Sequence, residues 1–201
     1  MAQYAYYNPM TFEVIDWIDT SSLNVVLPDS VAAINEEQWQ SKSDKCWICL
    51  EPLSFITTPP PDNFYRLKGN EWVYDIVLFN LALEGAKTHV IKTIKTYRDS
   101  ITADYIIIDG NHFHSDANSR IQQMSLTRMG LAKQVPEGLM WQTKNNGLIA
   151  LTNDIAAQFE TVTMDHDMRL FANTQHHIMA VEALEDIQAV QDYDYSTGWQ
   201  P

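Results

Sequence analysis

Basic residues are scarce in this sequence: 13 lysines and arginines stand against 26 aspartates and glutamates, a formal net charge of −13. Nucleic-acid ligands require a basic surface that neutralises phosphates, so this balance argues against nucleic-acid binding. The sequence contains no run of 18 apolar residues and therefore predicts no membrane span. Its N-terminal segment lacks a basic stretch followed by an apolar one, so we expect synthesis in the cytoplasm without a secretory signal.

Cysteine is limited to Cys46 and Cys49, in the sequence Cys-Trp-Ile-Cys. A lone C-x-x-C is compatible with a redox pair or with half of a zinc site. The Leu-Glu-Pro that follows does not resemble the helix start that a redox pair uses, and no second C-x-x-C or H-x₃₋₅-H supplies further zinc ligands. We therefore interpret both cysteines as ordinary strand residues, and metal binding or pairing stays open.

Catalytic motifs are also missing. Neither G-x-x-x-x-G-K-[ST] nor G-x-G-x-x-G is present, and Ser119 has no glycine-rich elbow around it. His112 and His114 alternate along a predicted strand and face one side, but no third metal ligand follows at a fixed offset. In Asp165-His166-Asp167, a helix would turn neighbouring residues about 100° apart, so they cannot converge on one atom. We predict that the chain is not an enzyme and has no metal or cofactor site.

Glycine and proline are absent from residues 152–190, a stretch of 39 residues. It opens with Thr152-Asn153-Asp154, a favourable helix start. One unbroken helix would span roughly 58 Å at 1.5 Å per residue. This exceeds the usual length in globular proteins, so the stretch is either broken once or packed against several partners.

The apolar residues of this stretch lie on two sides of the predicted helix. One side carries Ile155, Phe159 and Val162, and roughly the opposite side carries Met164, Met168, Phe171 and Ile178. A helix with two apolar sides needs two neighbours. These are either other parts of the chain or another subunit, which makes a homo-oligomer one option.

The remaining sequence predicts an α+β fold with a β-rich N-terminal module at 1–82 and a helical domain at 83–201. The module contains many aromatic residues, which suit small β-structures with thin cores. Its predicted strands are residues 12–18, 23–27, 30–34, 46–49, 53–56, 65–67 and 72–74, with a short helix at 35–39. The helical domain has predicted helices at 86–101 and 116–133, hairpins at 104–114 and 140–151, and the long helical stretch.

Charge is divided unevenly within the helical domain. Residues 83–151 hold 8 bases and 6 acids, whereas residues 152–201 hold 1 base and 9 acids. Either the basic helix around Lys92 and Lys95 lies near the acidic final stretch, or the acidic face meets a basic partner.

Residues 109–120, Asp-Gly-Asn-His-Phe-His-Ser-Asp-Ala-Asn-Ser-Arg, resemble the signature "dG..f.tDa.SR" of a domain of unknown function common in tail proteins of tailed phages. That family continues with a helix and a hairpin of the form "W.t.dn....lt", similar to residues 141–152 here. A long helix with a central phenylalanine follows, here Phe171, and then a Gly-Trp-x-Pro-like end at 198–201. The resemblance covers about residues 84–201. The first half is similar to the front of phage tail-fibre assembly proteins, in Leu27-Pro28-Asp29, the 34–39 segment and three prolines at 59–61.

The resemblance implies a non-enzymatic phage tail component that caps, attaches or assists assembly of the tail fibre. Its partner would be a fibre, baseplate or tail protein, and its location the virion tail or the host cytoplasm during assembly. Both a structural protein of the virion and a transient chaperone fit. The alternative is a virion module that binds host-surface carbohydrate through tyrosines and tryptophans of the first half. The predicted interface residues are Tyr4, Tyr6, Tyr7, Trp17, Met164, Met168, Phe171 and Ile178.

Overall fold

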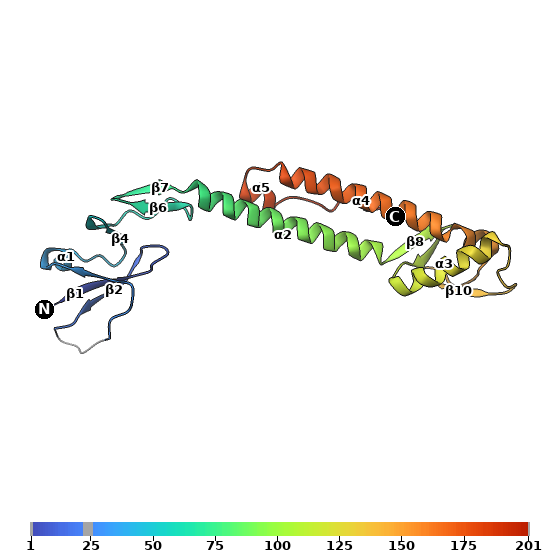
Figure 1. Ribbon diagram of the computed structural model, residues 1–201, viewed down its shortest axis with the longest axis horizontal. Helices are drawn as coiled ribbons and strands as arrows, with labels where there is room; N and C mark the ends of the chain where they lie inside the picture. The colour runs from blue at the N-terminus through green and yellow to red at the C-terminus, as the bar shows by residue number, and fades with distance from the viewer. Residues whose placement is uncertain (1, 22–25, 201) are drawn as a thin grey trace. The chain divides into compact units, whose positions relative to one another are not determined.

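The computed structural model describes residues 2–21 and 26–200 (Figure 1). The chain divides into two units, Met1–Leu81 and Ala82–Pro201. Small antiparallel sheets build the first unit, and long helices with β-hairpins build the second, so the predicted α+β class is confirmed. The predicted boundary between residues 82 and 83 lies inside helix α2 (Ile76–Thr102).

The first unit is centred on strand β1 (Gln3–Tyr7), which pairs with β2 (Val14–Asp19) and β3 (Val31–Ile34) in a sheet of order β2-β1-β3. Because strand side chains alternate between faces, Ala5 points to one face and is fully buried. It joins Val14, Cys46 and Ile48 in the core of this unit. Partly buried aromatic residues pack around that small core, as the aromatic-rich composition predicts.

Two hairpins and one short helix complete the first unit. The hairpins are β4 (Trp47–Leu50) with β5 (Leu53–Ile56), and β6 (Tyr65–Lys68) with β7 (Glu71–Tyr74), both as predicted. Helix α1 (Glu36–Gln40) begins with a capping box between Asn35 and Gln38. Of the predicted strand at 23–27, residues 23–25 lie outside the described residues, and residues 26–27 form no strand.

The second unit contains most of α2 and all later elements. Helix α2 is longer than the predicted 86–101 helix and buries Leu83, Val90 and Ile94 along one face. The elements that follow are β8 (Tyr105–Ile108), β9 (Asn111–His114), α3 (Ala117–Leu131), β10 (Met140–Thr143), β11 (Gly147–Ala150), α4 (Asn153–Glu182) and α5 (Ile187–Gln191). Helices α2 and α4 lie side by side and antiparallel (Figure 1), and Lys87 Nζ donates to the carbonyl of Glu182 at 2.9 Å.

The long helical stretch is broken once. Helix α4 begins after Thr152, whose side chain accepts from the backbone N–H of Ile155 at 3.2 Å, in agreement with the predicted start. It ends at Ala183, and Asp186 then caps α5 by accepting from the N–H of Ala189 at 2.8 Å. An aspartate offers the backbone a competing hydrogen bond, which favours a new helix start over continuation.

The core of the second unit lies where both hairpins meet α3 and α4. Phe113 of β9 and Phe159 of α4 are almost fully buried and meet edge to face, with ring centroids 5.0 Å apart. Ile106, Ile108, Leu126, Leu151 and Ala156 belong to the same cluster. Each large side chain buried there stabilises the fold by about 1.5–3 kcal/mol. Among the described residues, no helix is long and apolar enough to cross a membrane.

Candidate interaction surfaces

The signature segment 109–120 first builds a hairpin turn and a core contact. Asp109 (φ 49°) and Gly110 (φ 76°) both have positive φ, as the tight turn between β8 and β9 requires. Phe113 anchors the hairpin in the core. The Asp-Gly pair of the signature therefore specifies backbone geometry.

The same segment then starts helix α3. Asp116 accepts from the backbone N–H groups of Asn118 and Ser119 at 3.0 and 3.1 Å, and the Ser119 hydroxyl donates to it at 2.6 Å. The hydrogen bond from the Ser119 hydroxyl and those from the backbone lower the pKa of Asp116. Asp116 and Ser119 are thus a helix cap, and Ser119 is engaged as a donor rather than poised as a nucleophile.

Arg120 ends the signature and connects four segments. Its guanidinium donates to both carboxylate oxygens of Asp167 on α4, at 2.6 and 2.9 Å. It also donates to the carbonyl oxygen of Thr102 at 2.9 Å and to that of Ser115 at 2.8 Å. The planar guanidinium of arginine presents several donors at fixed angles, so one side chain can tie the end of α2 and the end of β9 to α4.

Two asparagines of the second hairpin lock it to the first. Asn145 accepts from the N–H of His112 at 2.9 Å and donates to the carbonyl of Gly110 at 2.9 Å. Asn146 donates to the side-chain oxygen of Asn111 at 2.9 Å. The Asn-Asn pair of the "W.t.dn" motif therefore joins the two hairpins. The His112 ring stacks on Tyr105 with centroids 4.3 Å apart.

Helices α3 and α4 approach closely at Gly130. A Cβ placed there would lie 2.5 Å from the backbone nitrogen of Ala157 and 2.7 Å from the carbonyl oxygen of Asn153, so only glycine permits this approach. At the opposite end of α3, Arg120 holds Asp167, so the two helices run antiparallel. The surface between them, here called the α3–α4 groove, contains two hollows of about 250 and 480 Å³.

The two hollows of the α3–α4 groove share the side chains of Glu160 and Met164. The smaller, the Gln123 hollow, also contains Gln123, Met124 and Phe159. The larger, the Leu131 hollow, also contains Thr127, Leu131 and Met168. Because Gln123 and Thr127 are one helical turn apart, the hollows follow each other along α3.

Gln123 is a buried polar residue with one unsatisfied atom. Its side chain is only 2% exposed, and its Nε2 donates to the carbonyl of His114 at 2.8 Å. Its Oε1 has no hydrogen-bond partner in the part of the chain that the structure describes. A buried acceptor without a partner destabilises the fold by about 1–3 kcal/mol.

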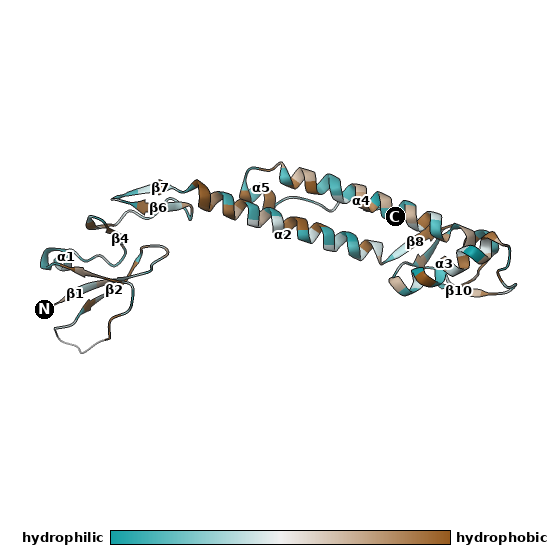
Figure 2. Cartoon of the chain, in the orientation of Figure 1, coloured by the Kyte–Doolittle hydropathy of each residue, from teal (hydrophilic) through white to brown (hydrophobic). Residues whose placement is uncertain are grey.

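An exposed apolar row follows α4 and is here called the α4 stripe: Met164, Met168, Phe171 and Met179. Their exposed fractions are 59%, 64%, 57% and 68%. In Figure 2, apolar and polar segments alternate along α4. Large contiguous apolar surfaces on soluble domains mark interaction sites more often than scattered exposed residues do.

Ile178 lies on the predicted side of α4, about 20° from Phe171 at 100° per residue, but it is not part of the exposed stripe. It is only 9% exposed, whereas Met179 is open. At about 100° per residue, Ile178 lies about 60° from the fully buried Val181, and Met179 lies about 160° from it. The sequence periodicity predicts the side of α4 on which these residues lie, but not that Ile178 is covered there.

The C-terminal segment covers another side of α4. Trp199 is buried, stacks on His177 with centroids 5.4 Å apart, and meets Tyr97 of α2 edge to face. His177 Nε2 donates to the carbonyl of Thr197 at 3.0 Å, and in the neutral ring Nδ1 accepts from the Tyr193 hydroxyl at 2.8 Å. Burial raises the pKa of Tyr193. These contacts give the terminal Gly-Trp motif a packing role.

The three side chains of Asp165-His166-Asp167 point to different partners, as helical geometry predicts. Asp165 pairs with Arg169 at 3.0 Å, and Asp167 pairs with Arg120. His166 is 1% exposed, and its Nε2 has no partner among the described residues. Burial is the largest cause of a lowered His166 pKa. A search of the described residues finds no group of three or more histidine, cysteine or acidic residues placed to hold a metal.

The cysteines lie in the core of the first unit. Cys46 precedes β4 and Cys49 lies within it, and both thiols are buried and free. Burial raises the pKa of the Cys46 thiol, which keeps it protonated and unreactive at neutral pH.

The predicted aromatic interface residues of the first unit divide between two faces of β1 and the adjacent strand. Tyr7 stacks with Phe12, and Trp17 of β2 packs on Phe55, so both surround the core. Tyr4 and Tyr6 alternate with the buried Ala5 and are partly exposed on the other face. The structure therefore does not bring the four residues into one patch.

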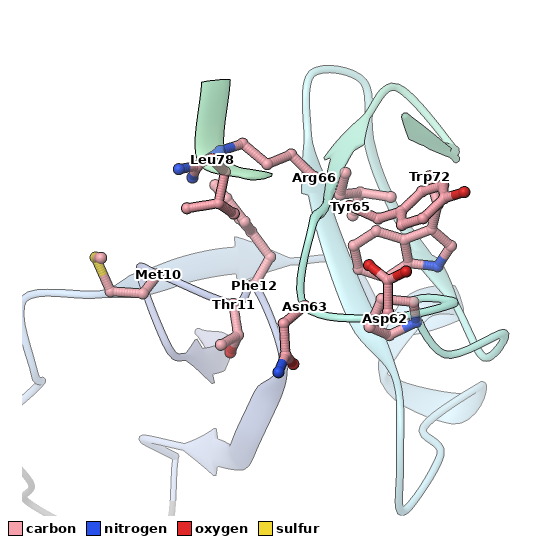
Figure 3. Close-up of a pocket in the computed structure, with 11 residues that line it drawn as sticks. Met10, Thr11, Phe12, Asp62, Asn63, Tyr65, Arg66, Trp72 and Leu78 are labelled. Carbon is pink, nitrogen blue, oxygen red and sulfur yellow. The ribbon is translucent and has the colours of Figure 1, made fainter. Parts of the chain in front are cut away.

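A separate pocket in the first unit gathers other aromatic and polar residues (Figure 3). Tyr65 and Trp72 lie together beside Asp62, whereas Met10 and Thr11 come from the opposite wall. Its volume is about 160 Å³. Asp62 accepts from the backbone N–H of Phe64 at 2.7 Å, which orders the loop that forms one edge. Aromatic faces beside amide and carboxylate groups can hold a polar ligand with flat apolar faces.

Several residues of the α3–α4 groove are not predicted from the sequence, chiefly Gln123, Met124 and Leu131 on α3. Met124 and Leu131 are seven residues apart and so share one helix face, a signal available in the sequence. Gln123 carries no such signal, since its burial depends on the position of α4.

A helical unit with two interlocked hairpins, a capped α3 and a long α4 is thus built by the motifs that the sequence displays. The family model described as Domain of unknown function (DUF4376) matches residues 85–197, more than half of the chain. The chain belongs to this family. No match was found among curated proteins or among solved structures.

Proposed function

We propose that the chain is a non-enzymatic component of a phage tail that caps, attaches or assists assembly of the tail fibre. The observation that supports this most directly is the α4 stripe, four large apolar side chains of which each is more than half exposed. A partner protein that covers them would bury apolar surface at roughly 25 cal/mol per Å². The signature residues of the family serve turns, caps and helix contacts, so they support a scaffold rather than a reaction centre.

Co-purification with the tail fibre of the same phage tests the proposal. The tagged chain is co-expressed with the C-terminal part of the fibre, as wild type and as Phe171→Asp. Because Phe171 is 57% exposed, the substitution should leave folding intact but place a charge in the interface. Loss of co-purification is the expected result.

Leu148→Asp is the matched control, since Leu148 is 62% exposed on β11 and lies outside the α4 stripe. It should retain the fibre. Equal retention by Phe171→Asp would remove the stripe from the interface. Mass spectrometry of mature virions separates the two forms of the proposal: presence of the chain favours a cap or adaptor, and absence favours a transient chaperone.

The pocket of the first unit (Figure 3) supports a second candidate, a module that binds host-surface carbohydrate. Tyr65 and Trp72 would face the sugar ring, and Asp62 and Asn63 would bind its hydroxyls. A glycan array probed with the full chain tests it. Asn63 is exposed, so Asn63→Ala should abolish binding without unfolding the protein. Binding that is unchanged in this variant would dismiss the pocket.

A further inference from the structure

We propose that the α3–α4 groove binds a basic amphipathic helix of a partner protein, which inserts aliphatic side chains into the two hollows and places a cationic side chain against Glu160. This deepens the proposed function and rests on it for the partner being a protein. The groove overlaps the α4 stripe at Met164 and Met168, whereas the stripe residues Phe171 and Met179 line neither hollow.

The lining of the groove suits apolar side chains of a partner. The Gln123 hollow measures about 250 Å³ and the Leu131 hollow about 480 Å³. Phe159 forms apolar lining, and Met124 and Met164 stand beside it. Methionine side chains are flexible and polarisable and are common on surfaces that accept apolar helices.

The spacing of the two hollows suits a helix. The two hollows lie next to each other, about one turn apart along α3, and share Glu160 and Met164. Side chains at positions i and i+4 of a partner helix are neighbours on one face and would enter the two hollows together.

Glu160 lines both hollows and is exposed. Gln123 Oε1 is buried without a partner, and no ion pair of Glu160 is present among the described residues. Asp167 and Asp165, by contrast, are already paired with Arg120 and Arg169. A lysine or arginine of an occupant would complement the charge of Glu160.

Charge also distinguishes this occupant from a second copy of the chain. Residues 153–182 of α4 contain five acids, Asp154, Glu160, Asp165, Asp167 and Glu182, and one base, Arg169. Two copies of α4 laid together would oppose like charges, whereas a basic helix would be attracted. On α3, Arg128 lines neither hollow, and Arg120, which lines the Gln123 hollow, is already paired with Asp167.

Three fluorescein-labelled peptides of equal length test the proposal by anisotropy with the purified full-length chain. The first carries leucines at i and i+4 with flanking lysines, the second has glutamates for the lysines, and the third has serines for the leucines. The first should bind saturably and more weakly at high salt, and the other two should not. Binding of the lysine and glutamate peptides with equal affinity overturns the proposal, as does absence of binding by all three.

Variants locate the site. Met164→Ser should weaken the first peptide about tenfold or more, because it removes apolar lining shared by both hollows. Glu160→Gln should weaken it about two- to fivefold, the range of one exposed ion pair. Glu185→Gln, which removes an exposed acid outside the groove, should change nothing. Unchanged affinity in Met164→Ser and Glu160→Gln overturns the proposal.

Two further results separate this proposal from the proposed function. If the chain self-associates and Met164→Ser abolishes the self-association, the occupant of the groove is a second copy of the chain. That result would overturn the proposal of a basic partner helix. The peptide measurement uses no fibre, so peptide binding without fibre co-purification would retain the groove and reject the tail-fibre role. If the chain co-purifies with the fibre but its groove binds no peptide, the proposed tail-fibre role is retained. The proposal that the groove binds a basic helix is then rejected.

Discussion

Arg120 and Asp167, 47 residues apart in the sequence, meet through two parallel hydrogen bonds of 2.6 and 2.9 Å. The pair joins the start of α3 to the middle of α4 and closes one end of the α3–α4 groove. At the other end of α3, Gly130 lets the backbones of α3 and α4 come close together. The groove therefore depends on the Arg120–Asp167 pair, here called the clamp, at one end. At the other end it depends on the absence of a side chain at Gly130.

Arg120→Lys should lower the free energy of unfolding by about 1–3 kcal/mol. Lysine keeps the charge, but it cannot donate simultaneously to Asp167 and to the carbonyls of Thr102 and Ser115. Urea denaturation followed by far-UV circular dichroism measures the change. Arg169→Lys is the matched control, because its pair with Asp165 is largely exposed, and it should cost no more than about 0.5 kcal/mol. Equal effects of the two substitutions would contradict the clamp.

Gly130→Ala should destabilise the second unit by about 1–3 kcal/mol. The new methyl group would meet backbone atoms of α4 at 2.5 and 2.7 Å, so the helices must separate. Gly85→Ala in α2 is the control, since a Cβ added there would meet nothing within 4 Å, and it should stabilise by up to about 1 kcal/mol through helix propensity. Thermal denaturation of both variants gives the comparison. A melting temperature of Gly130→Ala at or above wild type would show that α3 does not need the close approach.

Stability should fall as the pH drops below about 6.5, the ordinary pKa of histidine, because of His166. Burial lowers the folded-state pKa of His166, so below the unfolded-state value the unfolded chain binds more protons than the folded one. Arg120 and Arg169 also lower this pKa, while Asp167 and the backbone of Ile101 oppose the shift. The contribution is therefore present above the unfolded-state pKa and is lost toward acid.

Denaturation at pH 7.5 and pH 5.5 tests this for wild type, His166→Gln and His176→Gln. Glutamine retains a donor but does not titrate, so His166→Gln should reduce the pH dependence. His176 is exposed and serves as the control, which should behave as wild type. An identical pH dependence in all three proteins would assign the effect to other groups.

Trp199→Ala should release the C-terminal segment from α2 and α4. The substitution removes the stacking on His177 and the edge contact with Tyr97, and truncation of a buried aromatic costs about 3–5 kcal/mol. Chymotrypsin should then cleave after Tyr193 or Tyr195 severalfold faster, while the α3–α4 core remains intact, as expected for local unfolding. Phe171→Ala is the control, because Phe171 is exposed and its loss should leave the cleavage rate unchanged. Unaltered cleavage in Trp199→Ala would mean that Trp199 does not hold the segment.

The features that the sequence predicts well are those that depend on neighbouring residues. Asp109-Gly110 forms a turn because the pair tolerates positive φ, and Asp116 and Thr152 begin helices because their side chains accept backbone N–H groups within three residues. The α+β class and the hairpin strands follow from the same local chemistry. The break after residue 182 was one of two options, and Asp186 supplies a local reason for it.

The tertiary structure alone decides which surfaces are covered. Periodicity defines the faces of α4, but it does not say that the C-terminal segment covers His177 and leaves Met179 open. Nor does it reveal that Arg120 reaches Asp167, since the hydrogen bonds join residues far apart in the chain. The burial of Gln123 with an unsatisfied oxygen has the same origin. Local hydrogen bonds are therefore encoded in short segments, whereas the candidate interaction surface exists only after α3 and α4 have packed.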